Sequence, residues 1–317
     1  MNILILSAGT RNLLVSYFRK SGFDKVVAVD ASPLAPALYV ATNYYIVPRM
    51  TDPDYLKKIK EICVDERINA ILPLQEDELY LFAQQRHWFE EHGITLVVSD
   101  AHSIEICRDK YAFYQYLKQS GVPVLNTYLG LDEFELAVRE KEVTFPVFVK
   151  PRYGCGSIGC HVANSIEFIY ALKENYNEEL IIQQYNKGKE YGVDVYCDLI
   201  SGEITHTFIK EKLRMRAGET EKSISTKNNR IFNLVEKTVG FFSFRGPIDI
   251  DIFEMDSKFY ISEINPRFGG GYPHAFLCGI DFPKNIYNNT LGVPNKAAIR
   301  DYPEGIIALK TQSIISM

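Results

Sequence analysis

Over the first hundred residues, short apolar runs alternate with stretches whose apolar positions recur at helical spacing. The runs predict buried strands and the intervening stretches predict amphipathic helices. Strands that alternate with helices indicate a doubly wound parallel sheet, so we predict an α/β domain over residues 1–100. The predicted strands are Ile3–Leu6, Val26–Val29, Tyr44–Val47, Ala70–Leu72 and Ile94–Val98, and the predicted helices are Leu13–Phe18, Leu56–Cys63 and Leu79–Phe89.

The pattern changes after a helix predicted over Asp109–Ser120, which ends at a Gly-Val-Pro stop signal. Beyond it, strands follow one another in hairpin-like pairs, which is typical of an antiparallel α+β domain. We therefore place a boundary near residue 100 and a second domain over residues 101–317. The polar, aperiodic segment Arg214–Asn229 is predicted to be a mobile loop. The predicted strands are Val124–Leu129, Val147–Lys150, Cys160–Ala163, Leu180–Gln184, Tyr191–Leu199, Glu203–Lys212, Ile248–Phe253 and Lys258–Ile264, with a helix from Ser165 to Asn175.

Composition excludes several classes of protein. The 317 residues include 35 Lys and Arg against 40 Asp and Glu, for a net charge of −5, which disfavours nucleic acid and anionic membranes as partners. No apolar run reaches the roughly 18 residues of a membrane span, and the N-terminus lacks the basic region of a signal peptide. The six cysteines form no CxxC pair and no zinc-type cluster. We therefore expect a cytoplasmic protein with reduced thiols.

A glycine-rich loop follows the strand that ends at Lys150. A dinucleotide-binding site requires strand, glycine loop and helix, whereas here a strand follows the loop. Strand–loop–strand is the geometry of a flap over nucleotide phosphates, whose oxygens can accept from backbone N–H groups. An unliganded hairpin is the alternative. The loop residues singled out as candidates are Gly154, Gly156, Ser157 and Gly159, with Lys150 as the adjacent cation.

Two apolar strands near the C-terminus carry acidic side chains at a spacing of two. Asp249 and Asp251 share one face of the first strand, and Glu263 and Asn265 share one face of the second. Clustered carboxylates repel unless a cation joins them, and a set of oxygen donors without His or Cys suits Mg²⁺. An ordinary surface hairpin is the alternative. A third segment, Ile181–Tyr191, is a strand, a linker and a second strand that opens with Glu190; alone it is most simply a strand–turn–strand.

Taken in order, these segments resemble the ATP-grasp superfamily, and within it the single-unit carboxylate–amine ligases of the carbamoyl-phosphate-synthetase-like group. The resemblance depends on Lys110, Lys150, Glu190, Asp251 and the run Glu263-Ile264-Asn265-Pro266-Arg267. It covers roughly residues 100–295, and the parallel sheet before it resembles that family's Rossmann-like pre-ATP-grasp domain. It implies a two-lobed ATP-grasp domain over residues 101–317, with a lid at about 122–187.

The resemblance also implies a role for each matching residue, with ATP and Mg²⁺ as cofactors and Mn²⁺ as an alternative cation. Two positions depart from the common pattern: Gln183 stands where Glu often opens the hinge, and Asp251 stands where Gln or Glu is common, with Asp249 as its rival. The implied roles are phosphate binding by Lys110, Lys150 and the glycine loop, adenine binding by Gln183, Gln184 and Tyr185, ribose binding by Glu190, metal binding by Asp251, Glu263 and Asn265, and catalysis by Arg267 and Lys150. Apart from the resemblance, Arg216 is a further catalytic candidate, because the polar loop that carries it could close over the substrate or the γ-phosphate. For Arg216 a solvated loop charge is an equal alternative.

The implied reaction joins a carboxylate to an amine through an acyl phosphate. The expected partners are these two small-molecule substrates, and a homodimer is left open because dimers are common in the group. The alternatives are a subunit or fragment like carbamoyl phosphate synthetase, a non-catalytic ATP-binding module and, least favoured, a nicotinamide-dependent oxidoreductase. The substrates themselves are not readable from the sequence.

Overall fold

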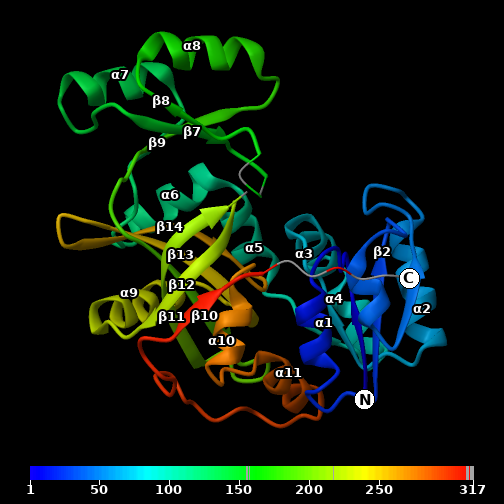
Figure 1. Cartoon of the computed structure of the whole chain (residues 1–317). Coiled ribbons are helices and arrows are strands. Elements are labelled where there is room, and N and C mark those ends of the chain that lie inside the picture. Colours follow the sequence, from blue (N-terminus) through cyan, green and yellow to red (C-terminus); the bar gives the residue numbers. More distant parts are fainter. Residues whose placement is uncertain (155, 157, 217, 312–313, 315–317) are drawn as a thin grey trace.

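The computed structural model describes residues 1–154, 156, 158–216, 218–311 and 314. It contains a five-stranded, a four-stranded and a six-stranded sheet (Figure 1). The predicted combination of a parallel α/β domain and a two-lobed α+β region is confirmed. In Figure 1 the four-stranded lobe stands above the six-stranded sheet, and the N-terminal domain lies beside that sheet.

The N-terminal sheet has the order β3-β2-β1-β4-β5, and all its strands are parallel. Its central strands are buried almost throughout because helices cover the sheet, which explains their continuous apolar runs. The elements are β1 (Asn2–Ile5), α1 (Asn12–Phe18), β2 (Lys25–Asp30), the 3₁₀ helix η1 (Pro36–Val40), β3 (Asn43–Ile46), α2 (Tyr55–Asp65), β4 (Ala70–Leu72), α3 (Glu76–Ala83), α4 (Arg86–Glu91) and β5 (Thr95–Leu96). The single helix predicted over Leu79–Phe89 is two helices, because the chain turns at Gln84 and Gln85.

Two helices lead from this domain into the four-stranded lobe, which we call the lid. The lid sheet has the order β6-β9-β7-β8 and is antiparallel, with helices α7 and α8 above it in Figure 1. Asp109 accepts hydrogen bonds from two backbone N–H groups in the first turn of α6 and so caps that helix. The elements are α5 (Ala101–Arg108), α6 (Lys110–Gln119), β6 (Thr127–Tyr128), α7 (Leu131–Arg139), β7 (Val147–Pro151), β8 (His161–Ala163), α8 (Ile166–Asn175) and β9 (Leu180–Gln184).

The six-stranded antiparallel sheet has the order β14-β13-β10-β11-β12-β15. The mobile loop predicted over Arg214–Asn229 is wrong. Strand β11 continues to Arg216 and pairs with β12 in a hairpin, and Asn228 caps helix α9. The exposed end of this hairpin has little apolar periodicity, which is why the pattern did not reveal it. The elements are β10 (Glu190–Cys197), β11 (Ile204–Arg216), β12 (Glu219–Thr226), α9 (Asn229–Val239), β13 (Gly246–Met255), β14 (Lys258–Asn265), α10 (Tyr272–Leu277), α11 (Phe282–Thr290) and β15 (Ile307–Leu309).

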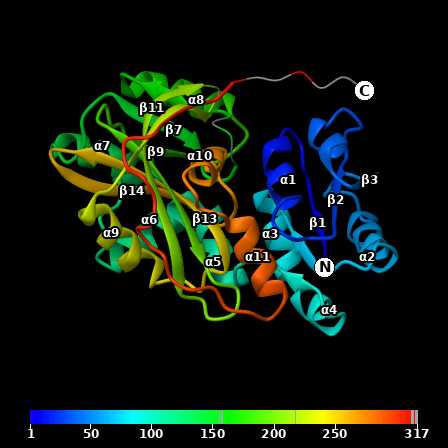
Figure 2. The same cartoon turned by 60° about the horizontal axis from the view of Figure 1, so that its bottom comes forward.

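The buried apolar side chains form three clusters. One cluster joins a face of the N-terminal sheet to the six-stranded sheet and includes Ile3, Phe18 and Phe268. A second covers the other face of the N-terminal sheet, and a third lies within the lid around Phe134 and Val147. The N-terminal domain and the six-stranded sheet therefore pack as one body, and Figure 2 shows α11 lying between them. The lid has a core of its own.

Among the described residues, no helix has both the length and the apolar character needed to cross a membrane.

Buried His274 fixes strand β15 against the hairpin. Its Nδ1 lies 2.8 Å from Ser223 Oγ and its Nε2 lies 3.1 Å from the carbonyl oxygen of Ile306. Since a carbonyl only accepts, Nε2 carries the proton and Nδ1 accepts from the serine hydroxyl. Burial, with Lys210 nearby, lowers the pKa of His274 from 6.5 to about 4.

We predict that His274 makes stability depend on pH in mildly acidic solution. A depressed pKa in the folded state means that the unfolded chain takes up the proton first, so this contribution is present above pH 6.5 and is lost as the pH falls to about 4. His274→Gln should be less stable at pH 7 and should lose less stability between pH 6.5 and 4. Urea unfolding of both proteins across this range measures the difference; equal slopes would contradict the assignment.

Candidate active site

A cavity of about 640 Å³ lies where the lid, the six-stranded sheet and the N-terminal domain meet. Loops after β1 and β4 reach it from the carboxyl ends of those strands, where Arg11, Gln75 and Glu76 line it. Most of the predicted site residues share this cavity although they are widely separated in the sequence. They are Lys110, Lys150, Gly154, Gly156, Gln183, Gln184, Tyr185, Glu190, Asp251, Glu263, Asn265 and Arg267.

Lys150 is the most deeply buried cation that the lid contributes. Its side chain is 6% exposed, and no hydrogen bond joins its ammonium to any residue within the described ranges. Burial lowers the pKa of Lys150, and this is opposed mainly by Glu263. A buried ammonium without a hydrogen-bond partner is costly, whereas an anion in the cavity would supply the acceptors that it lacks.

Lys110, at the start of α6, lies on the other side of the glycine loop. Its Nζ donates to the carbonyl oxygen of Gly154 at 2.5 Å, which holds the loop over the cavity. Gly154 and Gly156 have φ values of +108° and +71°, a region that L side chains rarely adopt, and a Cβ at either would meet open space. The loop can therefore bring its backbone close to a bound molecule. Ser157 lies outside the described residues.

An ion pair ties the lid to the body next to this loop. Arg152, just after β7, donates from Nε to Asp109 Oδ1 at 2.7 Å and from Nη2 to Oδ2 at 2.5 Å. This two-pronged geometry is the strong form of an Arg–carboxylate contact. Because Asp109 also caps α6, the same carboxylate positions the helix that carries Lys110 and the lid strand that carries Lys150.

The predicted adenine hinge comprises the last two residues of strand β9 and Tyr185. Gln183 is buried, and its Nε2 donates to Thr127 Oγ1 at 3.0 Å across the β6–β9 pair. Tyr185 packs nearly parallel to Phe148, with ring centroids 6.4 Å apart. Both rings line the cavity, so this end offers flat apolar surface beside backbone polar groups. Such a surface suits a planar heterocycle.

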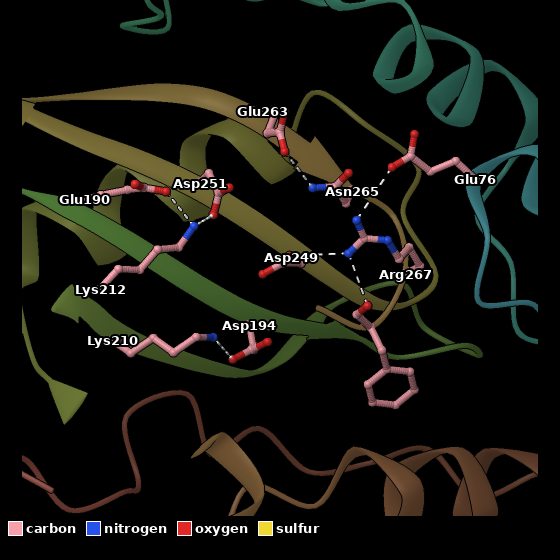
Figure 3. A network of polar contacts seen from close by, with 11 residues as sticks. Glu76, Glu190, Asp194, Lys210, Lys212, Asp249, Asp251, Glu263, Asn265 and Arg267 are labelled. Atoms are coloured by element: carbon pink, nitrogen blue, oxygen red, sulfur yellow. Dashed lines mark hydrogen bonds and ion pairs between the residues drawn. The ribbon is translucent and has the colours of Figure 1, made fainter. Parts of the chain in front are cut away.

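The acidic residues lie on the floor of the cavity, on the paired strands β13 and β14. Asp251 is the register partner of Glu263, and Asp249 is the partner of Asn265. Asn265 Nδ2 lies 3.3 Å from Glu263 Oε1 (Figure 3). Burial raises the pKa of Asp251, although the ammonium of Lys212 opposes this rise. Burial acts on Glu263 in the same direction, but Lys150 and Lys110 outweigh it and hold that pKa below its usual value.

Arg267 links the floor to the N-terminal domain. Its Nη1 lies 3.4 Å from Asp249 Oδ2, and its Nη2 lies 3.6 Å from Glu76 Oε1 (Figure 3). Burial raises the pKa of Glu76, and Arg267 opposes this. Asp249 thus lies beside Arg267, and Asp251 is the register partner of Glu263. The choice of Asp251 rather than Asp249 as metal ligand stays a prediction.

Two lysines on β11 belong to the site, although the sequence analysis did not single them out. Lys212 Nζ lies 2.6 Å from both Glu190 Oε1 and Asp251 Oδ1, and Lys210 pairs with buried Asp194 (Figure 3). The Lys-x-Lys spacing places both side chains on the cavity face of the strand. This spacing could have indicated two lysines on one face of a strand. The prediction missed it because both lysines lie at the end of the predicted strand.

Two predicted residues lie elsewhere. Gly159 packs against Pro151 and Tyr176 and is not among the described residues that line the cavity. Arg216 is on the β11–β12 hairpin with a side chain that is 66% exposed, and it pairs with Glu221 rather than lining the cavity. Its catalytic role stays a prediction, without support from this arrangement.

Comparison with known protein families identifies both parts of the chain. Residues 107–271 match the ATP-grasp domain family, and residues 3–97 match the PylC-like, N-terminal domain. The match to the ATP-grasp domain covers more than half of the chain, so the chain belongs to the ATP-grasp family, as its sequence motifs suggested.

Individual relatives are distant. The carbamoyl phosphate synthase large chain of Buchnera aphidicola is 26% identical over 275 residues, which cover 78% of this chain and 24% of that protein. The chain thus spans about a quarter of the length of the curated relatives it matches. Among solved structures, the biotin carboxylase domain of Hydrogenobacter thermophilus 2-oxoglutarate carboxylase, a dimer with MgADP and bicarbonate, has a TM-score of 0.76 at 20% identity, covering 96% of this chain and 73% of that one. N5-carboxyaminoimidazole synthetase from Staphylococcus aureus, complexed with ADP, has a TM-score of 0.74 at 18% identity, covering 93% and 78%.

The position of Lys150 generates a direct prediction about nucleotide affinity. Lys150→Met should weaken ATP binding about tenfold or more, since a hydrogen bond to a charged group is worth roughly 1.5–3 kcal/mol. Calorimetric titration with ATP and Mg²⁺ measures this. Lys173→Met is the matched control, because Lys173 lies in the same lid but donates to the carbonyl oxygen of Leu129. Arg216→Met should bind ATP as the wild type does; the assignment fails if it loses affinity while Lys150→Met keeps it.

Proposed function

We propose that this chain is an ATP- and Mg²⁺-dependent ligase that activates a substrate carboxylate as an acyl phosphate and couples it to an amine. The observation that carries the proposal is the placement of Asp251 and Glu263 on paired strands in one cavity with Lys150. Among the described residues the buried Lys150 ammonium has no hydrogen-bond partner, and Glu263 and Asp251 act on it electrostatically. The cavity therefore offers complementary charges for a phosphate and a divalent cation. Family membership supports ATP as the nucleotide.

The donor set fits Mg²⁺. Asp251 and Glu263 offer carboxylate oxygens, Asn265 adds an amide oxygen, and Glu263 is kept ionised by the lysines above it. Mg²⁺ takes few protein ligands and completes its octahedron with water and phosphate oxygens. When bound, it would neutralise charge on the transferring phosphoryl group. We assign Asp251, Glu263 and Asn265 to hold it.

The reaction follows in two steps. An oxygen of the substrate carboxylate attacks the γ-phosphorus of ATP, the bond to the bridging oxygen breaks, and ADP leaves. The amine nitrogen then attacks the acyl carbon, inorganic phosphate leaves, and the nitrogen loses a proton as the amide forms. Such phosphoryl transfer needs positioning and charge neutralisation rather than a protein nucleophile. Lys110, Lys150 and Arg267 meet that need, with Arg267 positioned by Asp249 and Glu76.

The lid serves to exclude water from the acyl phosphate. It is held against the body by the Asp109–Arg152 pair and by the contact between Lys110 and Gly154. The hinge residues Gln183, Gln184 and Tyr185 would hold the adenine where the lid joins the sheet. Glu190, the first residue of β10, would then accept hydrogen bonds from the ribose hydroxyls.

Two alternatives are open to experiment. A unit like part of carbamoyl phosphate synthetase is favoured by the curated relatives, whose large chains are about four times longer than the matched region. Such a unit would turn over bicarbonate or carbamate. A binding module would bind ATP without releasing ADP. We therefore propose to assay ADP release with a panel of carboxylates, bicarbonate included, with and without amino-acid and amine acceptors, and to measure subunit assembly alongside; ATP binding without ADP release from any member of the panel would contradict the ligase.

We predict that Glu263→Gln lowers ADP release by roughly 10²-fold or more, the loss typical when an electrostatic stabiliser of the transition state is removed. The protein should stay folded, because the substitution removes one of several mutually repelling carboxylates. Glu211→Gln is the matched control: Glu211 lies on the same sheet and pairs with Lys189 instead of lining the cavity. Unchanged turnover in Glu263→Gln would remove Glu263 from the metal site.

A further inference from the structure

Lys212 joins two carboxylates that the proposed function assigns to different parts of the nucleotide. Its ammonium lies 2.6 Å from Glu190, the ribose ligand, and 2.6 Å from Asp251, the metal ligand (Figure 3). The side chain is 6% exposed, so the bridge is shielded from solvent. A cation of the protein therefore already occupies the space between these two functional groups.

The surrounding backbone is shaped to admit this lysine. Gly192 on β10 is the register partner of both Lys210 and Asp251. A Cβ at Gly192 would lie 3.1 Å from Lys212 Cε and 3.2 Å from Lys210 Cε, so the lysine stems cross the strand where it has no side chain. Two carboxylates, each 2.6 Å from Lys212 Nζ, compensate the charge of this buried ammonium.

This bridge opposes metal binding when no nucleotide is present. A divalent cation bound to Asp251 would share that carboxylate with the Lys212 ammonium. The two positive charges would repel each other, with little solvent to screen the repulsion. Within the described part of the chain, no three His, Cys, Asp or Glu side chains are placed to hold a metal ion together. The site is therefore incomplete until other ligands arrive, and nucleotide phosphates are the ligands that also offer negative charge to Lys212.

We propose that Lys212 is a positioning residue that makes metal binding depend on the nucleotide: it holds Asp251 until a triphosphate enters, and the divalent cation then binds together with that nucleotide. Ribose hydroxyls compete with Lys212 for Glu190, and phosphate oxygens give the ammonium a new acceptor. This inference rests on the proposed function, because it takes Asp251 as a metal ligand and Glu190 as a ribose ligand.

The test measures Mn²⁺ binding to the nucleotide-free protein, by the loss of the free-ion electron paramagnetic resonance signal. Lys212→Met should bind Mn²⁺ at least tenfold more tightly than the wild type, because the competing charge is gone. Lys189→Met is the matched control: Lys189 lies just before β10, is 59% exposed and pairs at 2.9 Å with Glu211, the residue next to Lys212 on β11. It should bind Mn²⁺ as the wild type does. A folded Lys212→Met protein whose Mn²⁺ affinity equals that of the wild type would overturn the proposal.

Further variants separate this role from a structural one. Lys212→Arg keeps the charge and should restore weak Mn²⁺ binding, and Asp251→Asn added to Lys212→Met should abolish the gain. Lys212→Gln serves as a second neutral variant. Circular dichroism and thermal unfolding check the fold; if both neutral variants fail to fold, the bridge is structural and the proposal is wrong, since a nucleotide must be able to displace it. None of these measurements requires turnover. The absence of ADP release would therefore contradict the proposed ligase function and leave the proposal about Lys212 to be judged by Mn²⁺ binding.

Discussion

The constraint on which the site depends is the neutralisation of carboxylates that the six-stranded sheet places on one face. Strands β10, β13 and β14 present acids at neighbouring register positions, where mutual repulsion and desolvation would both oppose folding. Cations from three parts of the chain compensate the charge of these carboxylates. Strand β11 supplies Lys210 and Lys212, the segment after β14 supplies Arg267, and the lid supplies Lys150. Of the described acids of these strands that line the cavity, only Glu263 has no ion-pair contact, which leaves its carboxylate available to an external cation.

The N-terminal domain comes before the ATP-grasp domain in the sequence, and it also forms one wall of the cavity. One face of its sheet shares a core with the six-stranded sheet, where Phe18 meets Phe268 edge to face with ring centroids 6.0 Å apart. This packing fixes the N-terminal domain beside the cavity, which Glu76 and Arg11 line. The acidic strands and the wall formed by Glu76 and Arg11 thus belong to one packed body, whereas the glycine loop is carried by the lid.

Much of this arrangement was predictable because each signal was local. Buried parallel strands produce continuous apolar runs, and Asp251 and Glu263 alternate with apolar residues on their strands, so both the sheets and the facing acids could be predicted. The hairpin of β11 and β12 could not, because Arg214 and Arg216 lie at its exposed end, where no burial imposes a pattern. The Lys212 bridge depends on register between three strands and on the space above Gly192, and neither is a property of one stretch of sequence.

The separate core of the lid has a consequence for how the molecule comes apart. Cooperative unfolding requires that side chains share contacts, and the lid cluster around Phe134 is distinct from the cluster that unites the other two parts. Polar contacts such as the Asp109–Arg152 ion pair connect the lid to the rest of the molecule near the glycine loop. The free chain is therefore built as two cooperative units, for which one melting temperature is an incomplete description. A ligand that contacts both the lid and the rest of the molecule would couple the two units, so that they unfold in a single transition.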